Sequence, residues 1–173
     1  MVAIKNILFF ITTASALTVG KRDAATILND ISTIDSNVKA LTVTFNNYNG
    51  GVINAIPILN AESKLEDSIK QGTTDAKASA QQSSANSKSI IAAIDKLIPD
   101  IEASLAAAEK KKAQFAADNL TGTVQKDLAA LKSETDDFAS ALIAIASADT
   151  KAQGTAQKTK IDNDFNAAIA YFA

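Results

Sequence analysis

Large apolar residues recur at helical spacing over most of the chain after Asp23. The first run follows steps of three and four residues and comprises Ile31, Ile34, Val38, Leu41, Phe45 and Tyr48. This spacing places the side chains on one stripe, which predicts an amphipathic helix from about Asp23 to Asn47. Asn49-Gly50-Gly51 should end this helix, because glycine tolerates the left-handed backbone at a helix C-terminus.

A second helix is predicted from the apolar residues of 52–69, with Pro57 at its start or at a kink. Gly72-Thr73-Thr74 is the next expected break. Residues 70–89 contain no Val, Ile, Leu, Phe or Tyr. The stretch 76–85 should therefore form either a weakly packed helix or a mobile loop, since alanine and glutamine favour a helix whereas serine and asparagine oppose it.

Helical periodicity resumes at Ile90 and continues through three further segments. Their apolar stripes comprise Ile90, Ile94, Leu97, Ile98, Ile101, Leu105, Ala108 and Phe115; then Val124, Leu128, Leu131, Phe138, Leu142 and Ile145; and finally Ile161, Phe165, Ala168, Ile169 and Phe172. Pro99 should kink the first of these helices. The pattern predicts an all-α protein in which residues 23–173 form one bundle of about five amphipathic antiparallel helices.

The N-terminus has the pattern of a secretory signal peptide over residues 1–16. Lys5 supplies the positive charge, residues 7–17 supply the apolar segment, and Ala14-Ser15-Ala16 matches a small-x-small cleavage signal. We expect cleavage after Ala16. The apolar segment is too short to span a bilayer, so no transmembrane anchor is expected.

Residues 17–22 are predicted to be a short pro-segment that ends in Lys21-Arg22. This dibasic pair is either a processing site, cut after Arg22, or an exposed basic stub. The chain from Asp23 onward has 14 lysines, no arginine and 19 acidic residues, hence a net charge of −5. An acidic chain of this kind argues against nucleic acid and anionic membranes as main partners.

The residues that usually carry catalysis are absent from the sequence. There is no His and no Cys, which excludes a Ser-His-Asp triad, a thiol nucleophile, thiolate metal ligands and disulfides. Glu62 and Glu66 lie one turn apart and are expected to form a solvated acidic face. We therefore predict a protein that is not an enzyme and has no metal site and no cofactor.

Asn119-Leu120-Thr121 is an N-glycosylation sequon at an expected break between helices. Two interpretations stay open for Asn119. It carries a glycan in the secreted protein, or it only caps a helix junction.

The order of several short motifs resembles a fungal family. After a signal peptide and Lys-Arg come Tyr48-Asn49-Gly50-Gly51, then Ile56-Pro57-Ile58-Leu59, then Leu97-Ile98-Pro99 and a lysine-rich segment before Phe115. This order is similar to that of the hydrophobic surface-binding protein A family, which includes the antigenic cell-wall galactomannoproteins. The resemblance implies an all-α bundle, secretion or residence in the cell wall, adsorption to hydrophobic surfaces, and for some members a fatty acid held between the helices. The sequence ends at Tyr171-Phe172-Ala173 with no Ser/Thr-rich stalk or hydrophobic tail, which favours a soluble secreted form.

The resulting hypothesis is a secreted protein that binds a fatty acid-like lipid in its bundle, a hydrophobic surface, or both. The residues expected to line a central cavity are Phe45, Ile56, Leu65, Ile94, Ile101, Leu131 and Phe138. Residues 73–89 lack large apolar anchors and are the expected gate, with Lys70 or Lys88 near the mouth as a partner for a carboxylate. The alternative is a structural, antigenic cell-wall mannoprotein without a specific ligand, in which the many alanines only let helices approach closely.

Overall fold

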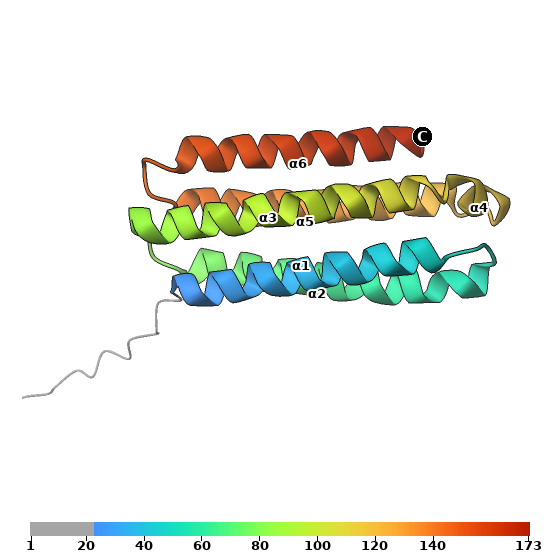
Figure 1. Ribbon diagram of the computed structural model, residues 1–173, viewed down its shortest axis with the longest axis horizontal. Helices are drawn as coiled ribbons and strands as arrows, with labels where there is room; N and C mark the ends of the chain where they lie inside the picture. The colour runs from blue at the N-terminus through green and yellow to red at the C-terminus, as the bar shows by residue number, and fades with distance from the viewer. Residues whose placement is uncertain (1–22) are drawn as a thin grey trace, which may run out of the picture.

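The computed structural model describes residues 23–173 as a bundle of helices (Figure 1). The helices are α1 (Ala24–Asn47), the 3₁₀-helix η1 (Val52–Ala55), α2 (Ile56–Ala78), α3 (Ser84–Glu109), α4 (Lys112–Ala117), α5 (Thr121–Ile145) and α6 (Lys151–Tyr171). The prediction of an all-α bundle with about five amphipathic helices is confirmed by the five long helices. The predicted cleavage positions Ala16 and Arg22 lie outside the described residues.

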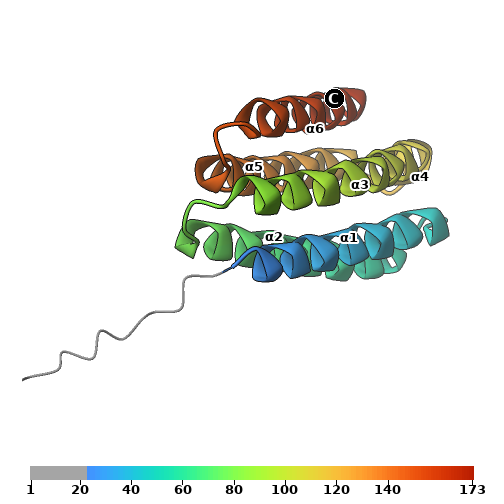
Figure 2. The ribbon, with the colours of Figure 1, turned by 60° about the vertical axis from the view of Figure 1, so that its left-hand side comes forward.

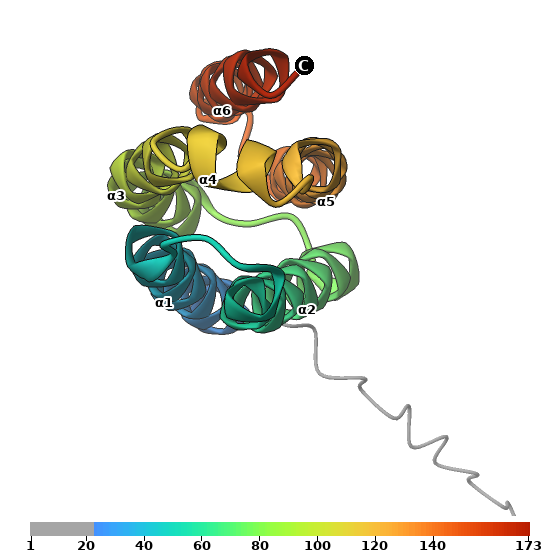
Figure 3. The ribbon, with the colours of Figure 1, turned by 90° about the vertical axis from the view of Figure 1, so that its right-hand side faces the viewer.

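The five long helices close into a ring. Each packs against two others, because α1 contacts α2 and α3, α2 contacts α5, α5 contacts α6, and α6 contacts α3. Viewed end-on, the ring surrounds a central axis, and α4 lies across one end between α3 and α5 (Figure 3). From the side the same helices form three layers, with α6 above the pair α3 and α5, and α1 and α2 beneath (Figures 1 and 2).

Successive long helices run antiparallel along the chain, as predicted (Figure 1). The seams between helices that are not consecutive differ. In each of the seams α1–α3, α2–α5 and α3–α6, the two helices run in the same direction. A ring with an odd number of members cannot alternate throughout, so five helices require at least one parallel seam; here all three seams between non-consecutive helices are parallel.

The predicted end of the first helix is confirmed, whereas the predicted break after Ile69 is wrong. Gly50 and Gly51 follow α1 with φ angles of +95° and +92°, the conformation that glycine adopts without strain. By contrast, α2 continues through Gly72 to Ala78. A Cβ at Gly72 would lie only 3.0 Å from Cε2 of Phe138, so this glycine provides a close approach between α2 and α5 and does not end the helix.

One of the two prolines begins a helix as the sequence suggested, and the other lies within a helix. Pro57 lies in the first turn of α2, where its missing N–H costs no hydrogen bond. Pro99 lies inside α3, and the helix continues through it to Glu109. The stretch 76–85 is partly helical, because α2 extends to Ala78 and α3 begins at Ser84 after the N-cap Ser83.

The two ends of the ring are closed by different chemistry. At the α4 end, Phe115 stacks on Tyr48 with ring centroids 4.7 Å apart and meets Phe45 and Phe172 edge-on. At the other end, the connection from α2 to α3 is hydrogen-bonded to α5, and the first turn of α3 is hydrogen-bonded to the connection that follows α5. Gln82 N donates to Ile145 O at 2.7 Å, and Ser147 N donates to Ser87 Oγ at 2.9 Å.

Within residues 23–173, no helix combines the length and the apolar character needed to cross a bilayer.

Candidate functional site

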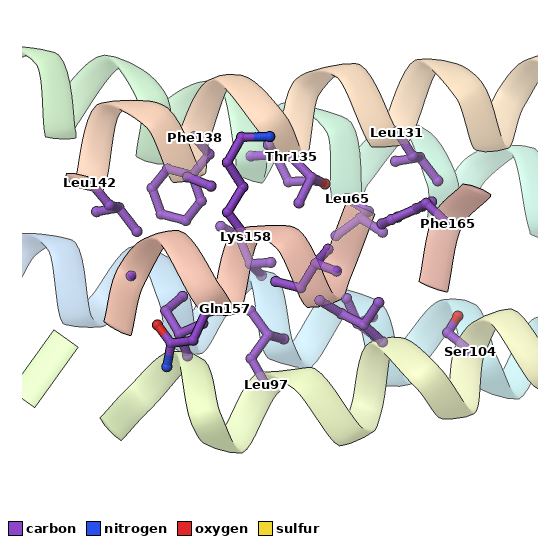
Figure 4. A pocket seen from close by; sticks show the side chains of 18 of the residues that line it. Leu65, Leu97, Ser104, Leu131, Thr135, Phe138, Leu142, Gln157, Lys158 and Phe165 are labelled. Carbon is purple, nitrogen blue, oxygen red and sulfur yellow. The ribbon is translucent and has the colours of Figure 1, made fainter. Parts of the chain in front are cut away.

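An apolar cavity of about 90 Å³ lies inside the ring, and all five long helices contribute to its walls. Almost all of the lining side chains are aliphatic or aromatic. The polar side chains among them are Ser87, Ser104, Thr135, Gln157 and Lys158, several of which are visible in Figure 4. A mostly apolar cavity with a few polar groups is typical of a site for a small apolar ligand.

Six of the seven residues predicted to face the interior line this cavity. They are Phe45, Leu65, Ile94, Ile101, Leu131 and Phe138. The expectation for Ile56 is wrong, because its side chain is 50% exposed. Ile56 and Pro57 form the first turn of α2, and the residue that turns inward there is Ile58, which is 6% exposed.

The first half of α6 forms a wall of the cavity that the apolar pattern did not identify. Residues 151–160 contain no large apolar side chain, so their periodicity gave no signal. The wall consists of Gly154, Gln157 and Lys158. Gly154 lets the helix lie close to its neighbours, since a Cβ there would be 3.3 Å from Cγ1 of Ile143 and 3.7 Å from Cδ1 of Ile91.

Polar contacts hold this half of α6 in place. Gln157 is buried, and its Nε2 donates to Ile91 O at 3.0 Å and to Asp95 Oδ1 at 2.6 Å on α3. On the other side, Lys158 Nζ donates to Asp136 Oδ1 of α5 at 2.9 Å. The α6 wall is therefore attached to both neighbours by side-chain hydrogen bonds where apolar packing is sparse.

Lys158 belongs to a group of four charged side chains between α5 and α6. Its Nζ also donates to Asp162 Oδ2 at 2.8 Å, while Lys132 Nζ donates to Asp136 Oδ2 at 2.8 Å. Burial opposes ionisation of Asp136, but the hydrogen bonds from Lys132 and Lys158 outweigh it and lower the pKa of Asp136 to about 2. The group is neutral overall, with two lysines facing two aspartates.

The lysines expected near the mouth lie elsewhere. Lys70 Nζ pairs with Glu66 at 3.1 Å and Glu134 at 2.9 Å, and Lys88 Nζ pairs with Asp149 at 3.4 Å. Neither residue lines the cavity, whereas Lys158 does. Most of the expected gate, residues 73–89, belongs to the helices α2 and α3.

A second, smaller cavity of about 20 Å³ adjoins the first and shares Phe45, Leu128 and Leu131 with it. Glu62 lines this space and is only 8% exposed, so the expectation that it belongs to a solvated face is wrong. Burial, followed by the negative charges of Asp127, Glu66 and Glu134, raises the pKa of Glu62 to about 8. At neutral pH this carboxyl group is therefore mainly protonated.

The sequence matches a family model and a cell wall mannoprotein. A family model described as hydrophobic surface binding protein A matches residues 24–144. Cell wall mannoprotein 1 of Aspergillus fumigatus is 31% identical over 114 residues, which cover 66% of this chain and 39% of that protein. The chain therefore matches well under half the length of this relative.

Two solved structures have the same fold. The crystal structure of Afmp4p in complex with palmitic acid superposes with a TM-score of 0.85 and 41% identity, covering 87% of this chain and all of the other. Ligand binding domain 2 of the Penicillium marneffei MP1 protein, complexed with multiple arachidonic acids, gives a TM-score of 0.82 with 18% identity, covering 89% of this chain and 98% of that domain. At that identity the second match supports the fold alone.

Proposed function

The chain belongs to the hydrophobic surface binding protein A family, and from this premise we propose that it is a secreted, non-enzymatic protein that holds a fatty acid-like lipid inside its helical ring and adsorbs to hydrophobic surfaces. The observation that carries the lipid-binding proposal is the apolar cavity to which all five long helices contribute. The Afmp4p structure supports it, because a relative with 41% identity and the same fold was crystallised with palmitic acid.

The size of the cavity constrains how a long acyl chain enters. A cavity of about 150 Å³ accommodates benzene, so the 90 Å³ present here must widen to take a lipid. We propose that the first half of α6 is the wall that moves, because it has no large apolar side chain and its hydrogen bonds to α3 and α5 can be exchanged for hydrogen bonds with water. Each buried CH₂ then contributes roughly 0.8 kcal/mol, which allows micromolar affinity after the costs of association.

Ser104 is the proposed partner of the lipid head group. It lines the cavity, is 6% exposed, and its hydroxyl makes no hydrogen bond with another side chain or with the backbone among the described residues. A hydroxyl that donates to a carboxylate forms a charge-assisted bond worth about 1.5–3 kcal/mol. Ser104→Ala should therefore lower the affinity for a fatty acid by roughly ten- to a hundredfold, whereas the exposed Ser89→Ala should leave it unchanged.

Titration with a fluorescent fatty acid tests the cavity directly. Wild-type protein should saturate near one ligand per chain, and Leu131→Trp should weaken binding at least tenfold, because the larger side chain fills the space. Val43→Trp is the matched control, since Val43 is 56% exposed and does not line the cavity. Non-saturable uptake would favour the alternative of a structural mannoprotein without a specific ligand. Equal saturable binding by both tryptophan variants with native circular dichroism would place the ligand outside the cavity and overturn the proposed site.

We also propose the maturation route expected from the sequence. Signal peptidase cuts after Ala16, and a second protease cuts after Arg22, so that the secreted chain begins at Asp23. Asn119 is exposed between α4 and α5, with a φ of 59°, a position open to a glycosyltransferase. N-terminal sequencing and the intact mass before and after glycosidase treatment test these proposals, and a retained Met1 or a single unmodified mass would contradict them.

A further inference from the structure

One corner of the bundle exposes large apolar side chains together. Val52, Ile53, Ile56 and Leu59, here called the apolar tip, are 60%, 80%, 50% and 50% exposed. They come from η1 and the first turns of α2, at the connection between α1 and α2 (Figure 1). Among the described residues they are four of the six large hydrophobic side chains that face solvent, so the exposed apolar surface is concentrated in one short segment.

The segment around the apolar tip carries no charge. Residues 40–61 contain no Asp, Glu, Lys or Arg, although charged residues make up 21% of the chain. The polar side chains nearest the tip in sequence, such as Asn49, Asn54 and Asn60, are amides, which cost much less to dehydrate than charged groups do. The segment of the tip therefore adds no charge that would oppose its transfer out of water, and the Asp118 carboxylate beside it is already hydrogen-bonded to Gly51 N and to the hydroxyl of Tyr48.

Hydrogen bonds fix the backbone turn that precedes the apolar tip. Asp118 accepts hydrogen bonds from Gly51 N, at 2.6 Å, and from the hydroxyl of Tyr48. Asn54 Nδ2 donates to Gly50 O at 2.7 Å. These bonds hold the turn before η1, so the exposed side chains are kept in solvent while Ala55 and Ile58, on the same short segment, are buried.

The size and the charge of the apolar tip indicate which kind of partner it binds. A stable protein–protein interface takes about 20–30 residues a side, far more than this patch offers a second copy of the chain. Anionic membranes are disfavoured, because the chain from residue 23 has a net charge of −5 and the tip has no cation. An exposed apolar patch whose own segment has no charge fits a condensed, uncharged hydrocarbon phase, such as a wax or a neutral oil.

We propose that the apolar tip is the part of the protein that docks on an uncharged hydrocarbon surface. The inference rests on the surface-adsorbing part of the proposed function and gives it a location. Docking there turns the α1–α2 end of the bundle toward the surface, next to the smaller cavity that Ile58 and Glu62 line. A lipid dissolved in the hydrocarbon phase then lies near that end of the ring.

Adsorption to an octadecyl-coated sensor, followed by quartz crystal microbalance, tests the proposal on the secreted chain. The variant Val52→Ser/Ile53→Ser/Leu59→Ser removes apolar surface without changing the charge. We expect its affinity for the sensor to fall at least tenfold. The control Val52→Ile/Ile53→Leu/Leu59→Ile keeps the same positions apolar and should adsorb like the wild type, equally at low and high salt.

The outcomes separate this proposal from cavity binding. Loss of adsorption by the serine variant, with unchanged fatty acid titration and circular dichroism, supports the tip as a docking site. Equal adsorption by all three proteins overturns it. So does a tip-dependent dimer in analytical ultracentrifugation, or equally tight binding to phospholipid vesicles. If the wild type adsorbs through the tip but takes up no fatty acid, cavity binding fails and the docking site stands.

Discussion

Replacing Glu62 with glutamine should stabilise the protein at alkaline pH and have little effect at acid pH. Burial, with the added charges of Asp127, Glu66 and Glu134, raises the pKa of Glu62 from its ordinary 4.5 to about 8. The folded state therefore holds a proton between these values that the unfolded state has released. Stability from this group is greatest below about pH 4.5 and falls as the pH rises towards 8.

The magnitude follows from the pKa shift. One pH unit corresponds to about 1.4 kcal/mol, and partial access of water to the carboxyl group reduces the full shift to an effect of about 1–3 kcal/mol. Glu62→Gln removes the ionisation while keeping the shape of the side chain. Its free energy of unfolding should exceed that of the wild type by this amount at pH 8.5, and the difference should shrink as the pH falls and disappear at about pH 4.

Urea denaturation at half-unit steps from about pH 4 to about pH 9 measures this difference. Asp67→Asn is the matched control, because Asp67 lies on the same helix and is exposed, so its effect should be small and constant with pH. A Glu62→Gln variant that is less stable than the wild type at pH 8.5, or a difference that does not change with pH, would refute the reasoning that Glu62 is buried mainly protonated.

Two predictions concern the α4 end of the ring. Phe115→Ala should lower the free energy of unfolding by about 3–5 kcal/mol in thermal melts, because Phe115 is 1% exposed and contacts three aromatic rings. Burial and the hydrogen bond to Asp118 raise the pKa of Tyr48 to about 12. Asp118→Asn should lower that pKa in an ultraviolet absorbance titration done in a Tyr171→Phe background, and an unchanged midpoint would contradict the assignment.

The helices that carry a continuous apolar stripe were predictable from the sequence. The stripe from Ile31 to Tyr48 gave α1, and the spacing of Val124 to Ile145 gave α5, because each stripe is the buried face of one helix. Gly72 misled the prediction, since a glycine that permits close packing and one that ends a helix look alike in sequence. Ile56 misled it as well, because periodicity does not specify the angle at which a helix begins.

The order of helices around the ring was not predictable from amphipathicity. A stripe shows which face of a helix is buried but not which helices it meets, and three of the five seams join segments that are not consecutive. The cavity wall on α6 escaped prediction for a related reason. Gly154, Gln157 and Lys158 face the interior without being large and apolar, so only their neighbours on α3 and α5 reveal their role.

The place of α6 in the sequence determines when the cavity forms during synthesis. This helix follows the other four long helices in the sequence, and it closes the ring by packing between α3 and α5. Until it emerges from the ribosome, Ile91 and Ile143 lack the helix that lies over them at Gly154. The space between the five long helices therefore forms only after α6 has been synthesised. A ligand of that space stabilises a chain that includes α6 and gives no help to one that stops before it, so termination within α6 leaves apolar side chains of the other helices exposed to water, where quality control can recognise them.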